Sequence, residues 1–131
     1  MLNVLLHILK ITLLLIIIDI PYLFLNVADF KSMIKDIQGK DINIKYIPAL
    51  ITYLIMSLGI YYFCVKNSNN DLKTSMISGA ILGFTVYGTF DFTSMTIFND
   101  WKYKQSIIDM IWGTILFTLT ILADEKLKIN I

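Results

Sequence analysis

Long apolar runs alternate with short polar segments along most of the chain. Four of these runs have about the length, roughly 20 residues, that a helix needs to cross the hydrocarbon core of a membrane. They cover residues 4–25, 46–65, 74–98 and 105–123. The polar turns at 66–73 and 99–104 are short, and the second is typical of an antiparallel helical hairpin. The pattern predicts an all-α integral membrane bundle of four transmembrane helices, in a single domain over 1–131.

The connection between the first two runs, residues 26–45, is longer and has a pattern of its own. Apolar side chains recur there at helical spacing, while charged residues occupy the other faces and Gly39 follows as a stop signal. The apolar positions are Val27, Phe30, Met33, Ile34 and Ile37. One prediction is a short amphipathic helix at about 27–38 that lies at the membrane interface, and the other is a helical loop packed on the bundle.

The first run has the position of a cleaved leader but lacks its pattern. Lys10 interrupts the apolar block, Asp19 lies inside it, and no Ala-x-Ala cleavage pattern follows, so we expect a retained helix. An even number of spans is expected to place both ends of the chain on one side. Lysines are divided almost equally between the two sets of loops, and the orientation therefore stays open.

Composition agrees with a multi-pass integral membrane protein and narrows the classes of function. The 131 residues are 56% hydrophobic and 16% charged, which is too apolar for an ordinary soluble fold. A net charge of +1 offers no basic surface for nucleic acid, and the single Cys64 excludes an internal disulfide. The expected partner is the lipid bilayer, with a homo-oligomer as a further prediction and no nucleic acid.

Three aspartates lie inside the apolar runs, whereas the other seven acidic residues fall in predicted loops or in the tail. Asp19, Asp91 and Asp109 stand seven, eight and five residues from the nearest predicted loop, all on the same membrane side. At about 1.5 Å per residue, this spacing places the three carboxylates roughly 8 to 12 Å inside that face. A charge in hydrocarbon costs about 2.5–3.5 kcal/mol, so these acids should face the bundle interior and pair with donors.

Each of these acids has an aromatic donor three or four residues away on its own helix. The pairs are Tyr22 with Asp19, Tyr87 with Asp91, and Trp112 with Asp109. A hydroxyl from Thr93 and another from Tyr53 on the second helix are expected to join them. The sequence thus predicts a polar intramembrane pocket that opens toward the 26–45 segment.

Small residues on the third and fourth runs predict close helix packing. They are Gly79, Gly83, Gly88 and Gly113, and the first two form the small-xxx-small spacing that lets helix backbones approach. We interpret the stripe as packing between helices rather than as a dimer motif.

The remaining polar and aromatic positions are assigned to the membrane surfaces. His7 lies twelve residues from Asp19, roughly 18 Å along the helix, and is expected at the opposite interface. Trp101 and the lysines beside it are typical of an interfacial anchor. The tail that begins at Asp124 is expected to be a solvated end.

These residues resemble the pattern of small four-helix membrane proteins known as domain of unknown function family 2177. The resemblance rests on Tyr87-Gly-Thr-Phe-Asp91-Phe-Thr93, on Trp101, and on Asp109 with Trp112-Gly113; Asp19, Tyr22, Pro48-Ala49, Tyr53, Gly59 and Phe63 extend it over nearly the whole chain. Ser94 departs from the Asn that the pattern usually has, and Lys102 from a Pro. The resemblance implies the membrane fold and singles out the same aspartates, but it implies no activity.

We favour binding or translocation of a proton, a cation or a small polar solute, because intramembrane carboxylates attract cations and exchange protons. One alternative is a structural or assembly protein of a membrane, such as a viral envelope, in which the acids only lock helix packing. Another is a lipid-acting membrane enzyme with the carboxylates as metal ligands or as a general acid/base pair. It is the weaker hypothesis because the only histidine, His7, lies roughly 18 Å from Asp19 along the helix. No cofactor is indicated, and a hard cation at the aspartates stays an open alternative.

Overall fold

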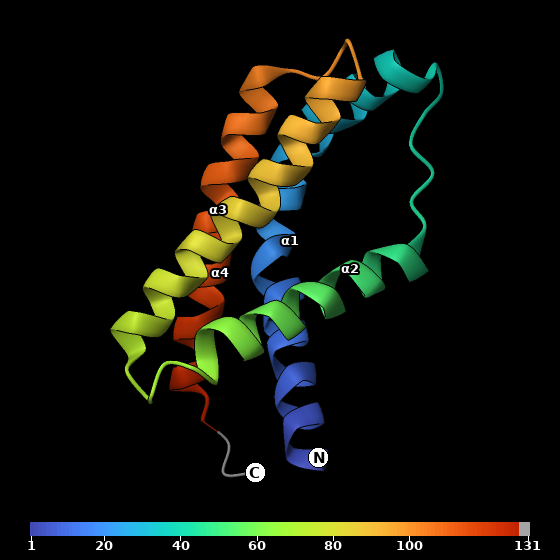
Figure 1. Ribbon diagram of the computed structural model, residues 1–131. Coiled ribbons are helices and arrows are strands. Elements are labelled where there is room, and N and C mark those ends of the chain that lie inside the picture. Colours follow the sequence, from blue (N-terminus) through green and yellow to red (C-terminus); the bar gives the residue numbers. More distant parts are fainter. Residues whose placement is uncertain (129–131) are drawn as a thin grey trace.

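Helices make up nearly all of the computed structural model, which describes residues 1–128 (Figure 1). They are α1 (Leu2–Gln38), α2 (Tyr46–Gly59), the π-helical segment η1 (Ile60–Val65), α3 (Leu72–Ile97) and α4 (Tyr103–Lys126). These described residues contain no strand, so the predicted all-α fold is confirmed. The start of α1, the end of α4 and the turn between η1 and α3 lie at one end of the bundle (Figure 1). The turn between α3 and α4 lies at the other end.

The first helix is much longer than the sequence predicts. At 37 residues, α1 measures roughly 55 Å against about 30 Å for a hydrocarbon core, so part of it extends beyond the membrane-crossing length. It continues through Pro21 and through Asn26, whose side-chain amide donates to a carbonyl one turn earlier at 3.1 Å. The predicted loop at Asn26 is therefore wrong, because 4–25 and 27–38 form one helix. The stop at Gly39 is confirmed, with the left-handed φ of 72° that glycine adopts without strain.

The second half of α1 packs on the turn between α3 and α4. Met33 is 1% exposed, and its sulfur accepts the Lys102 backbone N–H at 3.5 Å. The Phe30 ring meets the Trp101 ring edge-on, with 6.4 Å between centroids. Of the two predictions for residues 27–38, packing on the bundle is the one for which the structure shows contacts.

The predicted run 46–65 is helical throughout but changes type near its end. In η1 the backbone bonds join residues five apart, and the same spacing continues where the Lys66 N–H donates to the Tyr61 carbonyl at 2.8 Å. The Ser75 hydroxyl of α3 donates to another carbonyl of this segment at 2.9 Å. π-Helical turns are rare and occur frequently at functional sites.

The start of α3 is fixed by its N-cap. The Asp71 carboxylate accepts the Thr74 backbone N–H at 3.3 Å and also the Thr74 hydroxyl. These hydrogen bonds, the hydroxyl first, hold the pKa of the exposed Asp71 carboxyl below its usual value. The polar turn predicted from the sequence before α3 therefore ends in a defined cap.

Helices α3 and α4 form an antiparallel hairpin with closely spaced backbones. The glycines Gly79, Gly83, Gly88 and Gly113 all face the partner helix of this hairpin. A Cβ built at Gly83 would lie 2.1 Å from the Gly113 carbonyl oxygen, and one at Gly113 would lie 2.3 Å from the Tyr87 ring. At Gly88 the nearest atom is the flexible end of Met110, 3.3 Å away. The small-residue stripe thus lies between two helices of one chain.

Three helical stretches, α1, Tyr46–Val65 and α4, are long and apolar enough to cross a membrane. Large apolar side chains such as Leu13, Ile55 and Ile111 are more than half exposed, as expected for positions that face lipid. At 26 residues α3 is also long enough, but its glycines, serines and threonines make it less apolar. A fourth transmembrane span therefore stays a prediction.

Fully buried apolar side chains fill the middle of the bundle. We call Ile11, Leu15, Leu116 and Phe117, each 0% exposed, the apolar layer. Along both α1 and α4, this layer separates the buried aspartates on one side from a second polar group on the other. The fold therefore holds two polar regions, one toward each end.

Candidate functional site

Asp19 lies in the interior, where it bonds to two other helices. The residue is 4% exposed. The Tyr53 hydroxyl of α2 donates to Oδ2 at 2.5 Å, and Trp112 Nε1 of α4 donates to Oδ1 at 2.7 Å. Because each oxygen has a partner from a different helix, Asp19 ties three helices together.

Asp109 occupies a matching position on α4. It is 8% exposed, and its Oδ1 accepts the Tyr22 hydroxyl of α1 and Gln105 Nε2 at 2.9 Å. The Tyr22 and Trp112 rings are stacked, with centroids 4.8 Å apart and planes 7° from parallel. Helices α1 and α4 thus exchange donors, since each gives an aromatic donor to the aspartate of the other.

This exchange corrects the pairing predicted from the sequence. The sequence predicts that Tyr22 and Trp112 serve the aspartates on their own helices. In the structure Tyr22 bonds to Asp109, and Trp112 bonds to Asp19. Side chains three apart on a helix point toward the same neighbour, so their polar ends meet the groups of the facing helix.

Asp91 of α3 is fully buried, at 0% exposure. Trp101 Nε1 lies 3.3 Å from its Oδ1 and 3.1 Å from Ser106 Oγ. Within the described residues, Oδ2 of Asp91 has no hydrogen-bond partner. The carboxyl group of Asp109 is the ionisable neighbour of Asp91. Two carboxyl groups are therefore neighbours, and the fully buried one has an oxygen without a hydrogen-bond partner.

Three sequence interpretations around Asp91 need correction. Thr93 lies on the exposed face of α3 and does not join the cluster. Tyr87 packs its ring edge-on against Phe117, 6.4 Å between centroids, and the bond to Asp91 comes from Trp101 instead. Trp101 is 6% exposed and is therefore no interfacial anchor. Its position just after the turn, ten residues from Asp91, is the signal that would have identified it, since the chain reverses there.

A cavity of about 320 Å³ borders the cluster. Its lining includes Asp19, Tyr22, Tyr87, Gln105 and Asp109 from the bundle, Phe30 and Lys31 from the second half of α1, and Ile42 and Ile44 from the segment before α2. Most of these walls are apolar, so the carboxyl groups of Asp19 and Asp109 provide the charge at its inner end. Among residues 1–128, no three His, Cys, Asp or Glu side chains gather closely enough to hold a metal ion.

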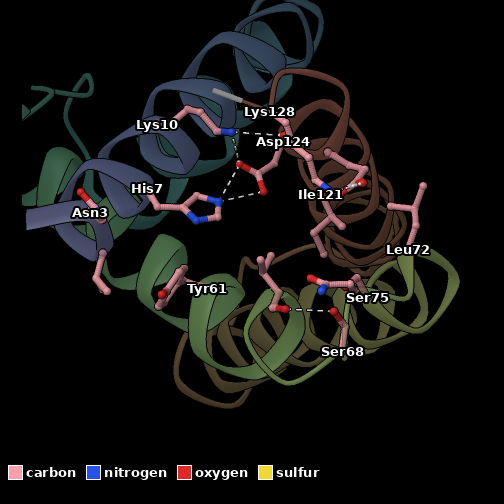
Figure 2. A pocket seen from close by; sticks show the side chains of 14 residues that line it. Asn3, His7, Lys10, Tyr61, Ser68, Leu72, Ser75, Ile121, Asp124 and Lys128 are labelled. Carbon is pink, nitrogen blue, oxygen red and sulfur yellow. Dashed lines mark hydrogen bonds and ion pairs between the residues drawn. The ribbon is translucent and has the colours of Figure 1, made fainter. Parts of the chain in front are cut away.

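A second polar group, which the sequence did not identify, lies at the opposite end of the bundle (Figure 2). His7 Nε2 lies 2.9 Å from both carboxylate oxygens of Asp124, and Lys10 Nζ lies 2.8 Å from one of them. Lys10 also donates to the carbonyls of Asp124 and Leu127 at 3.2 and 3.0 Å. Asp124 is 6% exposed because α4 continues to Lys126, so the prediction of a solvated tail is wrong for Asp124. Residues 126–128 are exposed, and the rest of the predicted tail, 129–131, lies outside the described residues.

The chain matches a known protein family over nearly its whole length. The family model described as "Predicted membrane protein (DUF2177)" matches residues 4–124. This range includes the three buried aspartates and also His7 and Asp124. No curated protein and no solved structure matches the chain.

Proposed function

The chain belongs to the DUF2177 family of predicted membrane proteins, and we propose that it binds and translocates a proton or a small cation at its buried aspartates. The pairing of Asp91 with Asp109 carries this proposal. Asp91 is wholly buried, one of its oxygens has no partner within the described residues, and its ionisable neighbour is another carboxyl group. Two carboxylates in such a site repel each other unless one is protonated or a cation lies between them.

The hydrogen-bond donors around this pair bond to one oxygen of each carboxyl group. Trp101 bonds to Oδ1 of Asp91, and both Tyr22 and Gln105 bond to Oδ1 of Asp109. These bonds orient both carboxyl groups through one oxygen each. The second oxygens are then the atoms that take up a proton or contact a small cation.

Access from one membrane side is provided by the 320 Å³ cavity. Asp109 lines this cavity, and Asp91 lies deeper. A proton or cation that enters through this cavity would reach Asp109 first and Asp91 next. Protons and small cations fit this arrangement because Asp91 is fully buried and offers a single oxygen without a partner within the described residues.

A structural role is the second candidate, and the geometry favours it for Asp19. Both oxygens of Asp19 are satisfied, by Tyr53 and by Trp112. A fully bonded carboxylate that joins three helices stabilises the bundle without needing an open position. The cluster therefore combines a structural aspartate with a functional pair.

The test is ion flux into liposomes that contain the purified protein, measured first for protons and then for K⁺ and Na⁺. Asp91→Asn keeps the shape of the side chain but cannot exchange a proton or balance a cation, so we expect flux to disappear. Asp36→Asn, an exposed aspartate of α1, is the matched control and should retain the flux of the parent. Absence of flux for every ion in the parent, or full flux in Asp91→Asn, would overturn the proposal.

A further inference from the structure

The His7 cluster borders a second cavity, of about 280 Å³, at the end of the bundle where α1 begins and α4 ends (Figure 2). The polar residues that line it include His7, Lys10, Tyr61, Asp124, Glu125 and Lys128. Two of its wall residues, Tyr61 and Val65, belong to the π-helical segment η1. A rare helix type, a cavity and an ionic cluster thus coincide, which is a combination typical of a functional site.

The ring of His7 has a defined tautomer. Nε2 lies 2.9 Å from both oxygens of Asp124, and a carboxylate accepts hydrogen bonds, so Nε2 carries a hydrogen. In the neutral ring, Nδ1 is then the nitrogen with a free electron pair. The edge-on contact with Tyr61, at 5.2 Å between centroids, supports the ring on another side. The His7 side chain remains 29% exposed, which leaves it accessible to water in the cavity.

Because Lys10 pairs with Asp124, the charge of Asp124 is balanced whether or not His7 is protonated. The Lys10 ammonium group pairs with Asp124 at 2.8 Å and also binds two carbonyls at the end of α4. Lys10 alone therefore balances Asp124 and caps the helix. Around His7, the other charged or titratable groups are Tyr61 of η1, Glu125 of α4 and Lys128 after it, and Glu125 pairs with Lys128 at 2.7 Å. With both acids already paired, His7 can gain or lose a proton without leaving a carboxylate unbalanced.

Buried hydroxyl groups lie beside the apolar layer, between the levels of His7 and of the aspartates. Thr12 Oγ1 donates to Ser57 Oγ at 2.8 Å, and Ser57 donates to the Tyr53 carbonyl at 2.8 Å. The hydroxyl of Tyr53 is bonded to Asp19. Thr12 is 5% exposed and Ser57 is 0% exposed, so these polar groups lie in the interior beside the apolar layer. Along α1, Thr12 lies roughly 7 Å from His7 and about 10 Å from Asp19.

We propose that His7 and Asp124 form a proton-exchange site, through which the proton handled by the buried aspartates enters or leaves at the opposite membrane face. The inference rests on the proposed function and names the proton as the transported species. In the step, His7 Nδ1 takes a proton from hydronium in the cavity, which becomes water, and the imidazolium pairs with Asp124. The reverse step returns the proton to water, so only N–H and O–H bonds form and break.

The first test is proton flux in liposomes with His7→Gln. The glutamine amide can still donate to Asp124, but it cannot take up a proton. We expect flux to fall by about a hundredfold or more, as when a positioned proton-transfer group is removed elsewhere. Asp36→Asn, an exposed position on the same helix outside this cavity, should keep the flux of the parent. Parental flux in His7→Gln overturns this inference and leaves the proposed function intact. A parent that carries K⁺ or Na⁺ but no protons also overturns this inference alone, whereas absence of flux for every ion in the parent overturns both.

The second test needs no variant, because His7 is the only histidine of the chain. Protein labelled with ¹⁵N-histidine in lipid vesicles therefore gives the signals of one imidazole ring. Because an exchange site must exist both with and without the proton, we expect the signals of the neutral and of the charged ring when the pH of the medium is varied. A ring that keeps one protonation state at every pH tested overturns the exchange site, even if the Gln variant fails to fold.

Discussion

At the scale of single residues, the three buried aspartates differ in how their oxygens are occupied. Asp19 has a donor on each oxygen, whereas Oδ2 of Asp91 has none within the described residues. The same residue type thus has two different hydrogen-bond environments. A carboxylate with two donors contributes stability, while one held beside another carboxyl group opposes folding unless a proton or cation joins it.

This difference predicts opposite effects of one substitution on stability. Asp19→Asn would turn an amide N–H toward an existing donor, and we expect it to lower the free energy of unfolding by about 1–3 kcal/mol. Asp91→Asn removes the repulsion with Asp109 and supplies a donor, so stability should stay equal or rise. Thermal unfolding of both variants in detergent gives the comparison. An equal loss in both would assign Asp91 to a structural role.

For these aspartates, the sequence identified some of the hydrogen-bond donors but not which aspartate each donor serves. The residue types Tyr22 and Trp112 were identifiable from their spacing, because buried carboxylates need donors nearby. The partner of each was not, since spacing along one helix does not say which side chain of the facing helix it meets. Trp101 was misassigned for a related reason: tryptophan near a turn is equally suited to the lipid interface and to folding inward.

At the scale of elements, the α3–α4 hairpin depends on the absence of side chains at a few positions. The backbones approach where Gly83 meets the carbonyl of Gly113, and the Tyr87 ring fills the space above Gly113. Bulk at this contact must push the two helices apart. Asp91, which lies on the same hairpin, would then move relative to Asp109.

Two matched glycine variants test this contact. Gly83→Ala places a Cβ 2.1 Å from a backbone oxygen, and we expect a loss of about 1–3 kcal/mol in stability despite the higher helix propensity of alanine. Gly88→Ala meets only the flexible end of Met110 at 3.3 Å, so its stability should stay the same or rise by up to about 1 kcal/mol. Unfolding in detergent measures both. Equal stability of the two variants would contradict the close packing at Gly83.

Helix α1 is the element that the sequence pattern described least well, because the pattern did not show that it is continuous. Polar Asn26 and the change from an apolar to an amphipathic pattern suggested a break. The helix continues because Asn26 bonds to its own helix and because Phe30 and Met33 find partners at the α3–α4 turn. Tertiary contacts thus extended an element whose local pattern favoured two.

At the scale of the whole molecule, two cavities lie toward opposite ends, with the apolar layer between them. One cavity reaches the acidic pair and the other reaches His7. This arrangement suits a protein that exchanges a proton or a small cation with the water on each side of the membrane. Transport between the two cavities requires that the two ends of α3 lie on opposite faces of the membrane. The proposed function therefore requires α3 to be a fourth transmembrane span. A homo-oligomer, predicted from the sequence, stays a prediction beside it.

Labelling from one side of the membrane tests this topology. Single cysteines at Asn3, Asn67 and Asn99, in a Cys64→Ser background, probe the start of α1 and the turns on either side of α3. We expect an impermeant maleimide to label positions 3 and 67 from one side and position 99 from the other. Labelling of 67 and 99 from the same side would show that α3 does not span.

The sequence by itself determined that this is a helical membrane protein and where its main apolar runs lie, and it singled out three aspartates inside these runs. These properties depend on local hydrophobic length and on a fixed rise per residue, so they can be counted along the chain. Only the tertiary structure decided which donor serves which aspartate and that His7 meets Asp124, 117 residues away. Such contacts depend on the rotation and register of packed helices, and hydropathy carries no information about either.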